Sequence, residues 1–192
     1  MVTPLSFSDF KLNTQLLETL KEQNYQTPTP IQAEAIPHIL EDKDLMAAAQ
    51  TGTGKTAAFV LPILEKLSKK GLTKEQAQNK VVRTLILTPT RELAAQVEKS
   101  AQTYGDKLPI KKQVVYGGVN INPQLRKLSK GTDILVATPG RLIDLYKQGA
   151  TRLNKVEIFV LDEADRMLDM GFIHDIRKII SKLPKRSEEH TS

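Results

Sequence analysis

Short apolar runs alternate with longer segments of helical period along most of this chain, and that alternation limits the folds open to it. The runs with strand character are Leu45–Ala49, Thr84–Leu87, Gln113–Tyr116, Ile134–Ala137 and Ile158–Leu161. The helical candidates are Thr14–Gln23, Pro30–Leu40, Thr56–Lys69, Arg91–Tyr104, Gly140–Lys147 and Phe172–Leu183. Apolar strands separated by helices are typical of a parallel sheet that is covered on both faces. The sequence therefore predicts an α/β, doubly wound, mostly parallel sheet, with its ligand site at the carboxyl ends of the strands.

Composition narrows the class of protein further. With 192 residues, 40% of them apolar, the chain can bury the core of a single domain, and the absence of cysteine excludes disulfides and zinc-thiolate sites. The N-terminus has no signal-peptide pattern, and apolar runs such as Leu85–Leu87 are far shorter than the roughly 20 residues that span a bilayer. We therefore expect a cytoplasmic protein that makes no use of a membrane. A net charge of +6 favours polyanionic partners, although many basic proteins bind no nucleic acid.

A glycine-rich turn follows the first apolar run and precedes an apolar helical segment. Its residues are Ala49, Gln50, Thr51, Gly52, Thr53, Gly54, Lys55 and Thr56. Backbone N–H groups in such a turn can surround phosphate, because glycine permits unusual dihedral angles. Lys55 would reach the β- and γ-phosphates, and the Thr56 hydroxyl would bind Mg²⁺. The alternative is a flexible turn with an exposed lysine, which the flanking strand and helix patterns disfavour.

Three carboxylates follow the last apolar run, within the tetrad Asp162-Glu163-Ala164-Asp165. They are Asp162, Glu163 and Asp165. A carboxylate at the end of a buried strand is suited to holding Mg²⁺, so Asp162 is a predicted metal-binding residue. Glu163 could then act as general base on an attacking water. The alternative is that the acids only favour the positive N-terminus of the next helix. The phosphate loop in the same chain favours the catalytic interpretation for Lys55, Asp162 and Glu163.

The tetrad reads Asp-Glu-Ala-Asp, and the chain resembles DEAD-box RNA helicases from Leu5 to about Arg186. The segment Ala49–Thr56 matches that family's form of the phosphate loop, in which alanine comes first. The stretch from Asp169 to Ile176 is similar to the bacterial RhlE-type branch. The resemblance implies a RecA-like P-loop NTPase domain that uses ATP and Mg²⁺, and it assigns Asp165 to coupling between motifs.

The segment Thr27–Gln32 resembles the family's Q motif, which we place within residues 5–33. The resemblance implies that Gln32 reads adenine, because its amide can both donate to and accept from the base. Phe7 stands where the family has an aromatic residue that stacks on adenine. Asn24 replaces the glycine usual in the family, and we expect the turn to be kept because asparagine tolerates left-handed dihedral angles.

Three further segments match motifs with which the family faces RNA. They are Pro89, Thr90 and Arg91 after the second run; Gly117 and Gly118 after the third; and Thr138, Pro139, Gly140 and Arg141 after the fourth. Each alone is also a good strand-to-helix turn. As a set they imply sequence-independent contacts with the RNA backbone, made by loops at one edge of the sheet.

Two departures from the family are visible near the end of the sequence. No Ser-Ala-Thr strand follows residue 186 and no second RecA-like domain follows it, so we expect residues 1–186 to be one helicase ATP-binding domain lacking a strand. That strand would run between the phosphate-loop strand and the strand that bears the acids, and its absence would leave backbone groups unpaired there. We interpret residues 187–192 as a non-native tail.

Three functions remain open at this point. The intact parent would be a monomeric, ATP-dependent RNA helicase that separates short duplexes, with little activity expected in the 192-residue chain itself. The chain could instead be a non-catalytic module that binds ATP and RNA. A P-loop ATPase acting on DNA is the third possibility.

Overall fold

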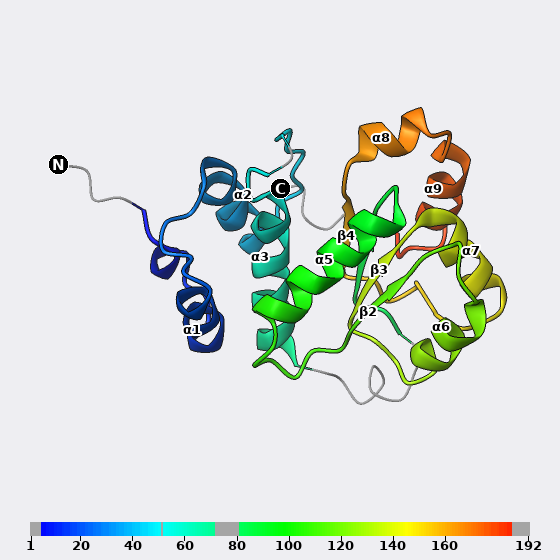
Figure 1. Cartoon of the computed structure of the whole chain (residues 1–192), viewed down its shortest axis with the longest axis horizontal. Helices are drawn as coiled ribbons and strands as arrows, with labels where there is room; N and C mark the ends of the chain where they lie inside the picture. Colours follow the sequence, from blue (N-terminus) through cyan, green and yellow to red (C-terminus); the bar gives the residue numbers. More distant parts are fainter. Residues whose placement is uncertain (1–4, 51, 72–80, 186–192) are drawn as a thin grey trace. The chain divides into compact units, whose positions relative to one another are not determined.

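The computed structural model describes residues 5–50, 52–71 and 81–185, and its elements fall into two compact units (Figure 1). The boundary lies inside helix α5 (Arg91–Tyr104), between Ala95 and Gln96. The first unit holds the N-terminal helices and most of α5, and the second holds the sheet with the remaining helices.

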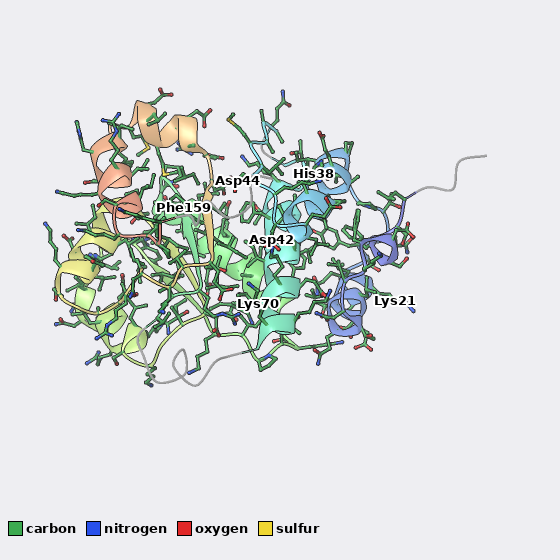
Figure 2. All side chains as sticks on the ribbon, turned by 180° about the vertical axis from the view of Figure 1, so that it is seen from behind. Lys21, His38, Asp42, Asp44, Lys70 and Phe159 are labelled. Atoms are coloured by element: carbon green, nitrogen blue, oxygen red, sulfur yellow. The ribbon has the colours of Figure 1, made fainter. Side chains whose placement is uncertain are left out.

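The first unit consists of a 3₁₀ turn η1 (Phe7–Phe10) and helices α1 (Thr14–Glu22), α2 (Pro30–Leu40) and α3 (Lys55–Lys70), together with the larger part of α5. Helix α2 packs against α3. The end of α2 is fastened to α3 by Lys66, whose Nζ donates to the Ile39 carbonyl at 3.2 Å and pairs with Asp42, which is labelled in Figure 2.

A buried carboxylate joins α1 to α3. Asn13 caps α1 by accepting a hydrogen bond from the Leu16 N–H at 3.0 Å. Its own N–H and its side-chain amide donate to Glu65 Oε2 at 2.7 and 2.9 Å. Since Glu65 is 0% exposed, these bonds compensate for the burial of its charge.

The second unit contains a four-stranded, fully parallel sheet in the order β2-β3-β1-β4. The strands are β1 (Thr84–Leu87), β2 (Lys112–Val115), β3 (Ile134–Ala137) and β4 (Ile158–Leu161). In register, Thr84 lies opposite Ile134 on one side and Ile158 on the other. All four strands therefore end at the same edge of the sheet.

Both faces of the two central strands are buried. Leu85, Leu87 and Leu135 belong to a core with residues of α6 (Ile121–Leu128), α7 (Pro139–Lys147), α8 (Ala164–Asp169) and α9 (Ile173–Ile180). Their neighbours Ile86 and Val136 point to the opposite face and are also buried. The expected α/β fold, a parallel sheet with helices on both sides as in RecA-like domains, is confirmed.

A cluster of charged side chains lies at the other edge of the sheet, where the strands begin. The Arg83 side chain is buried, its Nε lies 3.0 Å from Glu157 Oε1, and its Nη1 lies 4.0 Å from Asp133 Oδ1. Asp133 Oδ2 also accepts the Lys111 N–H at 2.8 Å. These groups tie together the starts of all four strands, since they precede β1, β2, β3 and β4 in turn.

The predicted strand at Leu45–Ala49 is wrong. Residues 43–50 have irregular backbone, and Met46 is 99% exposed. No described strand lies beside this segment, and a strand without a neighbour cannot satisfy its backbone hydrogen bonds. The described sheet therefore has four strands rather than five, with β4 at one edge.

The other elements agree closely with the sequence patterns. Strands β1, β3 and β4 have the predicted bounds, β2 begins one residue early, and α9 ends at Ile180 rather than Leu183. The sequence patterns did not predict η1, α6 or α8. The predicted tail at 187–192 lies outside the described residues. No helix in the described part is both long and apolar enough to cross a bilayer.

Candidate functional site

The glycine-rich turn leads directly into the first turn of α3, as predicted, although no strand precedes it. Gly54 forms the N-cap in a left-handed conformation (φ +82°), and Gly52 is also left-handed (φ +84°). The first intrahelical bond of α3 runs from the Ala58 N–H to the Gly54 carbonyl at 3.2 Å. Because the N–H groups at a helix start have no intrahelical acceptor, those of Lys55, Thr56 and Ala57 can face an anion.

Gln32 binds this turn to the predicted Q motif. It is 1% exposed, its Nε2 donates to the Gly54 carbonyl at 3.1 Å, and its Oε1 accepts the Thr29 N–H at 3.0 Å. A Cβ atom added to Gly54 would lie only 2.4 Å from Gln32 Nε2. Glycine is therefore required here by both its dihedral angle and the close approach of Gln32. The Nε2 and the Oε1 of Gln32 can each make one further hydrogen bond.

Two other residues near the Q motif have contrasting outcomes. Asn24 has φ +59°, so the expectation that asparagine keeps this left-handed turn is confirmed. Phe7 is buried and contacts Phe10 edge to face at 6.0 Å, and its ring face is not on the surface. Its stacking on adenine stays a prediction.

The turn residues themselves are held locally. The Thr53 hydroxyl donates to the Gln50 carbonyl at 2.7 Å, and both Lys55 and Thr56 are partly exposed at the start of α3. Thr51 lies outside the described residues. A lysine and a hydroxyl at a helix N-terminus beside two left-handed glycines form an arrangement suited to phosphate.

The acidic tetrad follows β4 in the second unit. Asp162 is only 4% exposed, and its N–H donates to the Leu87 carbonyl at 2.9 Å, which extends the pairing of β4 with β1. Glu163 has φ +55°, which is uncommon for a residue with a side chain, and it caps α8. Its Oε2 lies 3.4 Å from Arg166 Nη1. Asp165 is exposed in the first turn of α8.

The three segments predicted to face RNA come together at the carboxyl edge of the sheet. Thr90 caps α5, since its hydroxyl accepts the Leu93 N–H at 3.2 Å. Thr138 precedes α7, and its N–H donates to the Val115 carbonyl at the end of β2. Pro89 and Pro139 are buried behind these turns, while Gly117, Gly118 and Gly140 are exposed.

Side chains join these three segments directly. The Arg91 guanidinium lies over the Tyr116 ring, 5.4 Å from its centroid, so the loop after β1 contacts the loop after β2. Arg141 Nη2 donates to the Val119 carbonyl at 2.8 Å, which joins the loop after β3 to the same loop. Arg141 Nη1 is buried and has no hydrogen-bond partner among the described residues. The three loops predicted to face RNA are therefore joined to one another by their own side chains.

Gln124 contributes to this edge, and the sequence patterns did not predict its role. This buried α6 side chain accepts the Tyr116 N–H at 3.3 Å and donates to the Tyr116 carbonyl at 3.1 Å. It thus replaces a strand neighbour at the residue that precedes Gly117 and Gly118. Only its spacing from the two glycines could have indicated the contact.

The acids do not form a closed metal cage. No group of three or more His, Cys, Asp or Glu residues suited to a metal occurs within the part of the chain that the structure describes. Mg²⁺ does not need one, because it typically takes one or two carboxylates together with water and substrate phosphates. Asp162 and the Thr56 hydroxyl are chemically suited to that role.

A parallel sheet flanked by helices, with a glycine-rich turn at a helix start and an acid pair at a strand end, defines the class of nucleotide-binding α/β domains. Residues 29–191 match the family model described as DEAD/DEAH box helicase, and the chain belongs to that family.

Named relatives agree with this assignment. The chain is 46% identical, over 92% of its length, to a protein from Dictyostelium discoideum named probable ATP-dependent RNA helicase ddx3. It is 42% identical, over 96% of its length, to the DEAD-box ATP-dependent RNA helicase CshA of Streptococcus pneumoniae. The matched region is 26% of the first relative and 34% of the second, so the chain spans about a quarter to a third of their lengths.

Proposed function

We propose that this chain binds ATP with Mg²⁺ and the sugar-phosphate backbone of RNA, as the first domain of an ATP-dependent RNA helicase. The observation that carries the proposal is the hydrogen bond between Gln32 and Gly54, which joins the predicted adenine reader to the predicted phosphate loop. The names of both relatives support ATP dependence and RNA as a substrate. A second RecA-like domain would complete the parent enzyme.

The residues of the first unit have distinct tasks in this proposal. In the first unit, the amide of Gln32 binds the adenine edge, Phe7 packs against the base, and the turn from Ala49 to Thr56 surrounds the phosphates. The positive charge of Lys55 offsets charge on the terminal phosphate, and the Thr56 hydroxyl is a ligand for the cation.

The acids of the second unit have proposed roles of their own. Asp162 holds the cation, and its burial strengthens that interaction by excluding water. The carboxylate of Glu163 accepts a proton from the attacking water. Its positive φ sets the direction in which the side chain leaves the end of the strand. When ATP is bound, the bond that the water breaks is the one between the terminal phosphate and the ADP part of the molecule. Asp165 connects these acids to the RNA-binding segments.

The RNA proposal rests on the joined loops after β1, β2 and β3. Their donors are Arg91, Arg141 and backbone N–H groups near Gly117, Gly118 and Gly140, none of which reads a base edge. Binding would therefore be independent of sequence, and in the parent it would be coupled to the separation of short duplexes. The RhlE-type branch, a cytoplasmic location and a monomeric state stay part of the proposal.

A competition assay tests nucleotide selection. A fluorescent ATP analogue bound with Mg²⁺ should be displaced by ATP far better than by GTP, because the amide of Gln32 complements the adenine edge. Gln32→Ala should remove this preference. Equal displacement by ATP and GTP from the unmodified chain would contradict the assignment of Gln32.

The alternative functions give different results in a second assay. Matched single-stranded RNA and DNA oligonucleotides should differ in affinity for the chain, with RNA the tighter ligand and Arg141→Ala weakening it. Equal affinity would favour an ATPase acting on DNA. In a full-length version carrying both RecA-like domains, RNA binding without RNA-stimulated ATP hydrolysis would favour the non-catalytic module.

A further inference from the structure

An apolar pocket lies between α7 and α9 in the second unit, and none of the predicted catalytic residues lines it. Its volume is about 320 Å³, within the usual range of roughly 300–1,000 Å³ for ligand sites. Helices α7 and α9 pack against each other, and the pocket lies along that contact.

The inner surface of the pocket is hydrocarbon. Leu142, Leu153 and Ile179 line it and are almost completely buried. Ile143 and Tyr146 also line it and are partly buried, so they form walls that a ligand can reach. Burying an apolar group against such a surface is favourable, because it removes both from water. A polar group would find almost no hydrogen-bond partners there.

The rim of the pocket is positively charged. Lys147, Lys178 and Lys182 line it, all three are exposed, and no carboxylate lines it. Lys182 Nζ lies 6.0 Å from the centroid of the Tyr146 ring, so that ring is already partly covered by a cation. The helix dipoles favour positive charge at the C-terminal ends of α7 and α9. Even so, the positive charge of the three lysines is not neutralised by any carboxylate in the lining.

We propose that this pocket binds a peptide segment of a partner protein, with an aliphatic or aromatic anchor residue flanked by Asp or Glu. The anchor fills the apolar floor, and the flanking carboxylates pair with the three lysines. Charge complementarity selects such a segment and increases its association rate. RNA fits less well, since the floor has no polar group for phosphate and the one ring is partly buried beneath a lysine.

The site would connect a partner to the RNA-facing edge through a single helix. Residues Pro139–Arg141 form the first turn of α7, and Ile143 and Tyr146 follow on the same nine-residue helix, which is about 13 Å long. A bound peptide would contact the helix whose start carries a predicted RNA motif. The peptide site does not depend on the proposed nucleotide site, so either proposal can fail alone.

Peptide binding to the purified chain tests the inference. The probe is a fluorescein-labelled peptide with a central Leu-Leu pair flanked on both sides by Asp, followed by fluorescence anisotropy. Saturable binding should weaken at least about tenfold when the leucines become serine, or when the aspartates become asparagine. Amide shifts in the NMR spectrum of the unmodified chain should concentrate on α7 and α9.

Variants of the chain locate the site. Lys178→Glu with Lys182→Glu should weaken binding about tenfold, whereas Lys130→Glu, an exposed lysine of the same unit, should leave it unchanged. Ile143→Glu should also weaken it, and if that variant melts abnormally, the shift map still decides the location. The proposal is overturned by absent saturable binding, by equal binding of the serine peptide, or by shifts elsewhere. It is also overturned if Lys178 and Lys182 instead control the affinity for single-stranded RNA.

Discussion

The surroundings of residue 54 permit hardly any residue type other than glycine. Its φ of +82° is costly for any residue with a side chain, and a Cβ atom would lie 2.4 Å from Gln32 Nε2. Gly54→Ala should displace Gln32, weaken ATP binding at least about tenfold, and lower the free energy of unfolding by about 1–3 kcal/mol. Equilibrium binding and chemical denaturation measure the two effects.

Gly71 provides the matched control for that substitution. It lies at the other end of α3, also with positive φ (+60°), but a Cβ atom there would meet no atom of the described residues within 4 Å. Its ψ of −174° belongs to a region that only glycine adopts readily, so Gly71→Ala should be at least as strained as Gly54→Ala and should still keep ATP affinity. Loss of affinity in both variants would mean that strain, rather than contact with Gln32, is responsible.

Gln124 is predicted to act on RNA through its neighbour Tyr116. Gln124→Leu should leave the Tyr116 N–H and carbonyl without partners, costing about 1–3 kcal/mol and loosening Gly117 and Gly118. RNA affinity should fall while ATP affinity is kept, as measured by anisotropy with each ligand. Asn122→Leu, an exposed position on the same helix, is the control and should change neither affinity. Unchanged RNA binding by Gln124→Leu would remove Gln124 from the account.

Individual residues were predictable to different degrees. The left-handed turn at Asn24 was predicted from the glycine usual in the family together with the dihedral tolerance of asparagine, and the glycine requirement near Lys55 followed from phosphate chemistry. The bond from Gln32 to Gly54 did not, because it joins residues 22 positions apart. Gln124 and the lysine-rimmed pocket were missed for the same reason, since tertiary contacts leave no local pattern.

At the scale of elements, the N-cap of α1 also anchors that helix to α3. Asn13→Ala removes the bond to the Leu16 N–H and one of the donors to the buried Glu65 carboxylate. We expect a loss of about 1–3 kcal/mol in the free energy of unfolding, measured by denaturant titration.

A double-mutant cycle separates the two contributions. Combined with Glu65→Gln, the Asn13→Ala effect should be smaller by about 0.5–3 kcal/mol, because the partner of the lost amide is no longer charged. Strict additivity would show that Asn13 acts as a helix cap alone.

The elements show which signals the sequence carried. Buried parallel strands such as β1 and β3 are apolar apart from Thr84, so their bounds were predicted without error. The segment Leu45–Ala49 is also apolar, but it is mostly alanine, which is depleted in strands, and it is not part of a strand in the structure. Helix α6 was missed because Asn122-Pro123 near its start is typical of a turn, and α8 has only six residues.

At the scale of the whole molecule, the division into two units predicts that a substitution in one unit destabilises that unit most. Arg83→Met should act on the second unit, because it leaves Glu157 and Asp133 without their buried guanidinium at the starts of the strands. We expect a cost of about 3–5 kcal/mol, with faster hydrogen exchange in β1, β3 and β4 than in α2 and α3. Equal acceleration in both units would show that they unfold as one.

The central claim is that the turn from Ala49 to Thr56, held by Gln32, binds ATP with Mg²⁺. Thermal melting with and without Mg²⁺ and a slowly hydrolysed ATP analogue tests it most directly, because a ligand of the folded state alone raises Tm. We expect a saturable rise in Tm for the unmodified chain and no rise for Lys55→Ala, each measured against the same protein without ligand. No rise for the unmodified chain, or an equal rise for Lys55→Ala, would mean that this turn does not bind the nucleotide.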